Sequence, residues 1–114
     1  MTEGINVSEK LFQESVLKLA KTQQWLVFHA SPSSPRPGVW KSDGKGFPDL
    51  VLTSTHIPSR GVIFAELKTM DGKLSAEQVK YAQSLINAGI EYHTWRPSDI
   101  DKIAARLGRG PAPK

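Results

Sequence analysis

Three charged side chains lie within stretches of sequence that are otherwise apolar. Asp49 precedes the apolar run 50–52, and Glu66 and Lys68 interrupt the apolar run that begins at Val62. Burying an unpaired carboxylate or ammonium group costs free energy, so such groups require a partner such as a metal ion or a phosphate. Carboxylates can hold a divalent cation, and a lysine beside them can orient or deprotonate water.

The segments that carry these residues, 49–53 and 62–69, have the composition of β-strands. Because side chains alternate between the faces of a strand, Glu66 and Lys68 share one face. The other face carries three apolar residues, Ile63, Ala65 and Leu67. The chain between Asp49 and Glu66 is long enough for two antiparallel strands and a loop. We therefore expect a hairpin that brings the two carboxylates together.

Periodic apolar residues predict the remaining elements. The expected order is a helix over 8–24, strands over 25–29, 49–53 and 62–69, a helix from Ser75 to a stop at Gly89, a strand over 90–95 and a helix over 99–107. Ser8 and Ser75 are the expected N-terminal caps, and Gln78 stands at capping-box spacing from Ser75. This order predicts an α/β fold with a mixed central sheet flanked by helices.

The chain is 114 residues long, which indicates one domain with one modest core. We expect that domain to span 1–107 and to end in a flexible basic tail over 108–114. The net charge of +4 suits a polyanionic partner. There is no cysteine, which excludes disulfides, thiolate zinc sites and cysteine nucleophiles. With no signal peptide and no apolar run of about 20 residues, we expect a cytoplasmic protein that does not enter a membrane.

Four blocks of the sequence occur in a recognisable order. They are 46–52 (Gly-Phe-Pro-Asp-Leu-Val-Leu), 64–69 (Phe-Ala-Glu-Leu-Lys-Thr), 74–78 (Leu-Ser-Ala-Glu-Gln) and 95–99 (Trp-Arg-Pro-Ser-Asp). Together they resemble the VRR-NUC branch of the PD-(D/E)XK nuclease superfamily, over nearly the whole chain. The resemblance implies a restriction-endonuclease-like core with the element order αβββαβα. It also implies a metal-dependent endonuclease that hydrolyses DNA phosphodiester bonds.

The resemblance implies roles for individual residues as well. Asp49 and Glu66 would bind Mg²⁺, for which Mn²⁺ can substitute, and the backbone carbonyl of Leu67 would add a third oxygen ligand. Lys68 would orient or deprotonate the attacking water, or stabilise the developing negative charge. Gln78 would border the active site and contact a metal-bound water or a phosphate. Alternatively, Gln78 serves only as a helix cap.

Members of this superfamily take a further acidic ligand from the first helix, where Glu9 and Glu14 are the candidates. At about 100° per residue, Glu9 falls within the apolar stripe that contains Phe12 and Val16, whereas Glu14 falls on the opposite face. We therefore expect Glu9 to be an outer metal ligand and Glu14 to be exposed to solvent.

Cations and one tryptophan near the expected site are candidates for DNA binding. Cations can bind phosphates, and a tryptophan can stack on a base. The alternative for each of them is an ordinary solvated loop or turn. The histidines lack metal-binding spacing, so zinc is not expected. The candidates for DNA binding are Arg36, Trp40, Lys41, Lys45 and Lys73.

The sequence therefore predicts a Mg²⁺-dependent deoxyribonuclease of a type found in phages and bacteria. We expect it to form a homodimer and to act on branched or junction DNA. Two other classes stay open. One is a nucleic-acid-binding accessory domain that does not cut, and the other is a restriction-type or RNA-directed nuclease. The intact set of Asp49, Glu66 and Lys68 argues against the accessory domain.

Overall fold

The computed structural model describes the backbone of residues 3–30 and 44–108, and the side chains of these residues from Glu9 onward. The elements in chain order are α1 (Glu3–Thr22), β1 (Leu26–His29), β2 (Leu50–Thr53), the 3-10 turn η1 (Pro58–Arg60), β3 (Ile63–Leu67), α2 (Ala76–Asn87), β4 (Glu91–Trp95), the 3-10 turn η2 (Pro97–Asp99) and α3 (Ile100–Leu107). The predicted order of helices and strands is confirmed.

One four-stranded sheet forms the centre of the fold, in the order β1-β2-β3-β4. β1 pairs antiparallel with β2, β2 pairs antiparallel with β3, and β3 runs parallel to β4. A parallel pair needs a crossover connection, and α2 supplies it between β3 and β4. The molecule is therefore the mixed α/β sheet flanked by helices that the sequence predicts.

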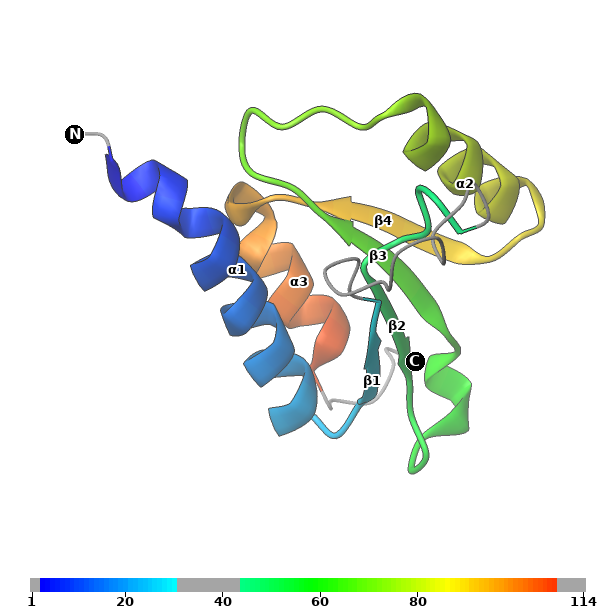
Figure 1. Ribbon diagram of the computed structural model, residues 1–114. Helices are drawn as coiled ribbons and strands as arrows, with labels where there is room; N and C mark the ends of the chain where they lie inside the picture. The colour runs from blue at the N-terminus through cyan, green and yellow to red at the C-terminus, as the bar shows by residue number, and fades with distance from the viewer. Residues whose placement is uncertain (1–2, 31–43, 109–114) are drawn as a thin grey trace, which may run out of the picture.

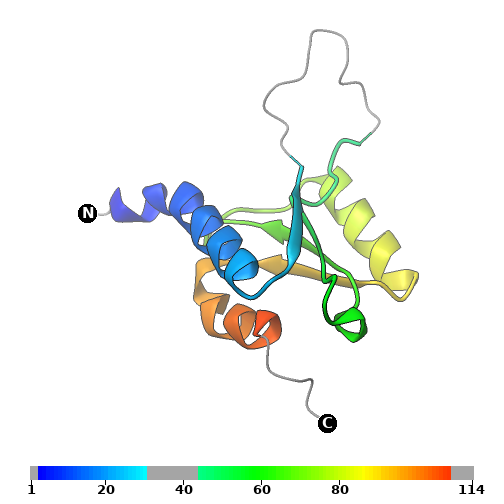
Figure 2. The ribbon, with the colours of Figure 1, turned by 90° about the horizontal axis from the view of Figure 1, so that it is seen from below.

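The two faces of the sheet are covered by different helices (Figure 1). α1 and α3 cover one face, and α2 lies over the other, as the view from below also shows (Figure 2). The main core lies between the sheet and the pair α1 and α3. Its buried residues are Phe12, Val16, Ala20, Trp25, Leu50, Leu52, Ile63, Ala65, Leu67, Trp95, Ile103 and Leu107. Because Ala65 and Leu67 enter this core, the intervening Glu66 must point toward α2.

α1 begins at Glu3 rather than at Ser8. The prediction that Ser8 caps the helix is therefore wrong, because a serine costs little inside a helix and does not by itself stop one. At the other end, Gln24 has a positive φ of 70°, and the N–H of Trp25 donates to the carbonyl of Ala20 at 3.0 Å. This Schellman-type turn directs the chain into β1 and places Trp25 in the core.

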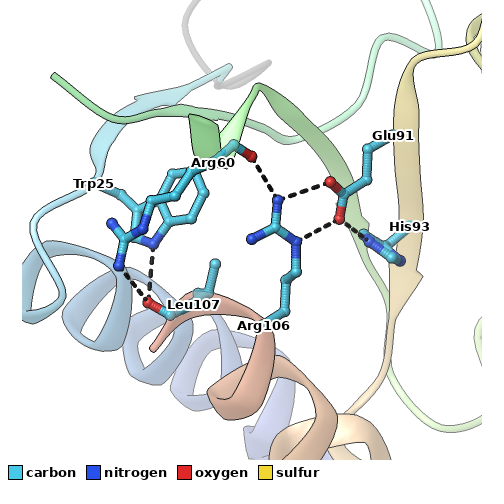
Figure 3. A network of polar contacts seen from close by, with 6 residues as sticks. All are labelled: Trp25, Arg60, Glu91, His93, Arg106 and Leu107. Carbon is cyan, nitrogen blue, oxygen red and sulfur yellow. Dashed lines mark hydrogen bonds and ion pairs between the residues drawn. The ribbon is translucent and has the colours of Figure 1, made fainter. Parts of the chain in front are cut away.

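A network of polar contacts fixes α3 to the sheet (Figure 3). Arg106 donates to both carboxylate oxygens of Glu91, at 2.8 Å each, and to the carbonyl of Arg60 at 2.7 Å. Arg60 lies over the ring of Trp25, at 4.5 Å from its centroid. Trp25 Nε1 in turn donates to the carbonyl of Leu107 at 3.0 Å. These contacts join the end of α1, the end of α3 and the start of β4 into one frame.

None of the helices that the structure describes is long and apolar enough to cross a membrane. The predicted tail begins at Gly108, whose N–H closes α3 by donating to the carbonyl of Ala104 at 3.0 Å. The rest of that tail, residues 109–114, lies outside the described residues.

Candidate active site

Asp49 and Glu66 lie side by side at one end of the sheet. Leu50 pairs with Ala65 in the antiparallel ladder of β2 and β3. Asp49, one residue before Leu50, therefore comes next to Glu66, one residue after Ala65. The two carboxyl groups are close enough to share a hydrogen bond. The expectation of a hairpin that brings the two carboxylates together is confirmed.

Burial and proximity make both carboxyl groups hard to ionise. Glu66 is 3% exposed, and its burial, followed by the charge of Asp49, raises its pKa to about 7. Burial also raises the pKa of Asp49, although the backbone N–H of Leu67 favours the charged form. Contact between the two side chains raises the pKa of Glu66 and lowers that of Asp49, as expected when two carboxyl groups share a proton. A divalent cation could replace that proton and neutralise both groups.

Leu67 and Lys68 complete the end of β3. The N–H of Leu67 donates to Oδ2 of Asp49 at 2.9 Å, whereas the N–H of Lys68 donates to the carbonyl of Trp95 on β4 at 2.9 Å. Because the N–H and C=O of one strand residue project to the same side, the Leu67 carbonyl also faces β2. The side chain of Lys68 is half-buried, and its charge favours the ionised forms of Asp49 and Glu66.

Gln78 reaches Glu66 from the first turn of α2. The Oγ of Ser75 accepts the N–H of Gln78 at 3.1 Å, and Oε1 of Gln78 accepts the N–H of Ser75 at 2.8 Å. The predicted capping box is therefore confirmed. Nε2 of Gln78 donates to Oε2 of Glu66 at 2.8 Å. One amide group thus caps the helix and also borders the carboxylate pair.

The loop that leads into β2 is fixed against α2. Gly46 has a φ of +89°, and a Cβ at this position would lie 2.5 Å from the backbone of Glu77. Only glycine permits so close an approach. Phe47 packs edge-on against Phe64 of β3 and Tyr81 of α2, with centroid distances of 5.9 and 5.5 Å. This packing sets the distance between the start of β2 and the first turn of α2.

Two hydroxyl groups on β4 lie beside the site, and the sequence argument missed both. Thr94 is the partner of Glu66 in the parallel register of β3 and β4, and its Oγ1 lies 2.9 Å from the hydroxyl of Tyr92. Burial, together with the charges of Glu66 and Asp49, raises the pKa of Tyr92. Alternation along the strand puts Tyr92 and Thr94 on one face, but it does not identify the neighbouring strand.

Neither described acidic side chain of α1 joins this group. Glu9 is exposed, which differs from its expected inward orientation, and Glu14 is exposed as expected and faces Lys10 at 4.0 Å. The first turns of α1 extend past the sheet (Figure 2). Within residues 9–30 and 44–108, no three His, Asp or Glu side chains form a group that could hold a metal ion. Glu9 as a metal ligand stays a prediction.

The candidates for DNA binding are only partly described. Lys45 is exposed in the loop that leads into β2, and Lys73 is exposed in the loop between β3 and α2. Both loops adjoin the strand ends that carry the carboxylates. Arg36, Trp40 and Lys41 lie outside the described residues, so their role stays a prediction.

Arg96 shapes the loop that carries Lys73. Its Nη1 donates to the carbonyls of Thr69 and Gly72, at 2.7 Å each, and so ties the end of β4 to the chain that follows Lys68. Gly72 lies against Lys68, since a Cβ on Gly72 would be 3.3 Å from Cδ of that side chain. The loop therefore supports the stem of Lys68 and fixes the path into α2.

Comparison with known proteins supplies no family for this chain. No protein-family model, no curated protein and no solved structure matches it.

Proposed function

We propose that this chain is a divalent-metal-dependent nuclease that hydrolyses DNA phosphodiester bonds, with a PD-(D/E)XK core and a VRR-NUC-like site. The proposal depends most on the contact between the Asp49 and Glu66 carboxyl groups, on adjacent strands and beside Lys68. The element order αβββαβα and the mixed four-stranded sheet agree with such a core.

The donor atoms at the site suit Mg²⁺ or Mn²⁺. Mg²⁺ prefers oxygen ligands, is typically held by one or two carboxylates, and keeps several of its waters. Asp49 and Glu66 would supply the carboxylates, and the carbonyl of Leu67, which faces β2, would supply a third oxygen. A bound cation would lower the pKa of its water and neutralise charge on the phosphate. The buried pair supports this proposal, because two adjacent carboxylates repel each other until a proton or a cation lies between them.

Lys68 is suited to act on the attacking water. It shares a strand face with Glu66, and its charge favours the ionised forms of both carboxylates. A lysine in that place orients or deprotonates water, or stabilises negative charge as it develops on the phosphate. The N–H of Leu67 holds one oxygen of Asp49, so this carboxylate would keep its orientation relative to the reacting phosphate.

The proposal includes DNA as partner and a homodimer as the active form. The exposed Lys45 and Lys73 adjoin the site, and a net charge of +4 favours binding to phosphates. Two copies related by a two-fold axis would present two sites to two strands. That arrangement suits branched or junction DNA.

Incubation with plasmid, linear and four-way-junction DNA, in Mg²⁺ or in EDTA, tests the proposed function. We expect cleavage in Mg²⁺ and in Mn²⁺, no cleavage in EDTA, and a loss of about 100-fold or more in Asp49→Asn and Lys68→Ala. Glu14→Gln should cut as the wild type does, because Glu14 is exposed on α1. Binding without cleavage would favour the accessory domain, cutting at one defined sequence would favour a restriction enzyme, and cleavage of RNA alone would favour an RNA-directed nuclease.

A further inference from the structure

The amide of Gln78 joins the N-terminus of α2 to the carboxylate pair. We propose that Gln78 is a positioning residue, which holds the Glu66 carboxylate in place for a divalent cation and is not itself a ligand of that cation. This inference rests on the proposed function for the identity of the cation. Its geometric part rests on the contacts of Gln78 with Ser75 and Glu66.

The orientation of the Gln78 amide is fixed by both of its neighbours. The backbone N–H of Ser75 can only donate, so the atom that faces it, at 2.8 Å, must be the amide oxygen. The nitrogen then faces Oε2 of Glu66 at 2.8 Å and donates to it. Turning the amide over would set two donors against each other at Ser75 and two oxygens against each other at Glu66. The amide therefore presents to Glu66 its nitrogen, which cannot bind a cation, and turns its oxygen toward Ser75.

Glu66 depends on this donor because it is almost fully buried. Only 3% of the residue is exposed, so water cannot readily replace a lost hydrogen bond. Among the described residues, no buried side-chain nitrogen or oxygen lacks a hydrogen-bond partner. Removing the Gln78 amide would leave Oε2 without this donor, and the carboxylate would then turn or take up a proton.

The turn that carries Gln78 is itself held in place. Its neighbour Glu77 lies against Gly46, where a Cβ would come within 2.5 Å of the Glu77 backbone. Tyr81, one turn further along α2, packs on Phe47 with a centroid distance of 5.5 Å. Gln78 thus projects from an anchored turn and holds Oε2 of Glu66, while Oε1 makes no contact with Gln78 that would compete with a cation.

Calorimetric titration with Mn²⁺, on wild type, Gln78→Ala and Ser75→Ala, tests the assignment. Partners that orient a metal ligand typically change metal affinity by about 10–100-fold, so we expect Gln78→Ala to weaken Mn²⁺ binding by that factor. Ser75→Ala removes the hydroxyl cap but leaves both amide contacts of Gln78, so its affinity should stay within about twofold of the wild type. Equal losses of Mn²⁺ affinity in the two variants would show that Gln78 acts only as a helix cap and would overturn the assignment. Complete loss in Gln78→Ala, as in Asp49→Ala, would make Gln78 a ligand and overturn it as well.

Thermal unfolding in EDTA tests the contact without any metal. With Glu at position 66, Gln78→Ala should lower Tm by about 4–8 °C more than it does in a Glu66→Leu background. Leucine accepts no hydrogen bond, so only Glu66 loses a donor when the Gln78 amide is removed. Equal shifts in the two backgrounds would overturn the positioning role. If the wild type binds no Mn²⁺ but this difference is present, the proposed function fails while the positioning of Glu66 by Gln78 stands.

Discussion

The fold removes Glu66 from water and sets a second carboxyl group, that of Asp49, against it. Burial is the larger cause, and the two together raise the pKa of Glu66 to about 7 from its ordinary value of 4.5. Between these values the folded chain binds a proton that the unfolded chain has released. The free energy of unfolding of the metal-free protein therefore falls as the pH rises from about 4.5 to about 7.

Replacement of Glu66 by glutamine should remove this pH dependence. At pH 8 in EDTA we expect Glu66→Gln to be more stable than the wild type, by on the order of 3 kcal/mol, and the difference should vanish below about pH 4. The amide keeps the shape of the carboxyl group and can still accept from Gln78. Urea unfolding across the pH range measures the effect.

Glu14→Gln is the matched control for that comparison, because Glu14 is exposed on α1 beside Lys10. Its stability should follow the wild-type curve at every pH. A wild-type stability that does not fall between pH 5 and 8 would contradict the raised pKa of Glu66.

The elements around the site are held together by a close approach between the loop that leads into β2 and the first turn of α2. Gly46 makes this approach possible, with a φ of +89° and no room for a Cβ beside Glu77. Gly61 provides the contrast, because its φ is +78° but nothing lies within 4 Å of a Cβ placed there. Both positions favour glycine by conformation, and only Gly46 requires it for packing.

Alanine at these two glycines should therefore have different costs. Gly61→Ala should lower the free energy of unfolding by about 1–3 kcal/mol, because its φ of 78° and ψ of −160° lie in a region that side chains other than glycine rarely adopt. Gly46→Ala should cost about 1–3 kcal/mol more, because α2 must move away from β2. Denaturant unfolding measures both, and Mn²⁺ affinity should fall in Gly46→Ala only. Equal losses of stability would show that the close approach is not tight.

Alternation and capping signals were sufficient to predict most elements and part of the site. The strand pattern placed Glu66 opposite the core, and the spacing of Ser75 and Gln78 predicted the capping box. The start of α1 was missed because Ser8 resembles a cap, although nothing local ends the helix there.

The tertiary contacts could not be read from the same patterns. Two of these contacts join residues that are distant in sequence. They are the contact of Gly46 with Glu77 and the pairing of Glu66 with Thr94. Both depend on how the elements pack, and local patterns do not contain that information. Glu9 is exposed although helical spacing places it among the apolar residues of α1, because that spacing gives a direction around the helix but not which of its turns pack on the sheet.

At the scale of the whole molecule, the frame and the site use opposite faces of the sheet. The frame joins α1, α3 and the start of β4 through Arg106, Glu91 and Trp25 (Figure 3). The site lies toward α2, at the end of β3. Hydrogen bonds from Arg106 are the largest of the effects that lower the pKa of Glu91. The stabilisation from this pair is therefore present above about pH 4.5 and is lost as the pH falls through the lowered pKa.

A change in the frame should accordingly alter stability and leave the site intact. We expect Glu91→Gln to lower the free energy of unfolding by about 1–2 kcal/mol at pH 7, because Arg106 loses its charged acceptor. The difference from the wild type should shrink as the pH falls below about 4. Mn²⁺ affinity at pH 7 should be unchanged. A parallel loss of affinity and stability would indicate that the two faces are not independent.

The proposed activity requires the Asp49 and Glu66 carboxylates to share one divalent cation. Crystals soaked in Mn²⁺, with diffraction recorded at the manganese absorption edge, test it most directly. We expect an anomalous peak in contact with both carboxylates, and the loss of that peak in Asp49→Asn crystals. A map with no peak between the two groups at saturating Mn²⁺, or with its only peak elsewhere on the molecule, would contradict it.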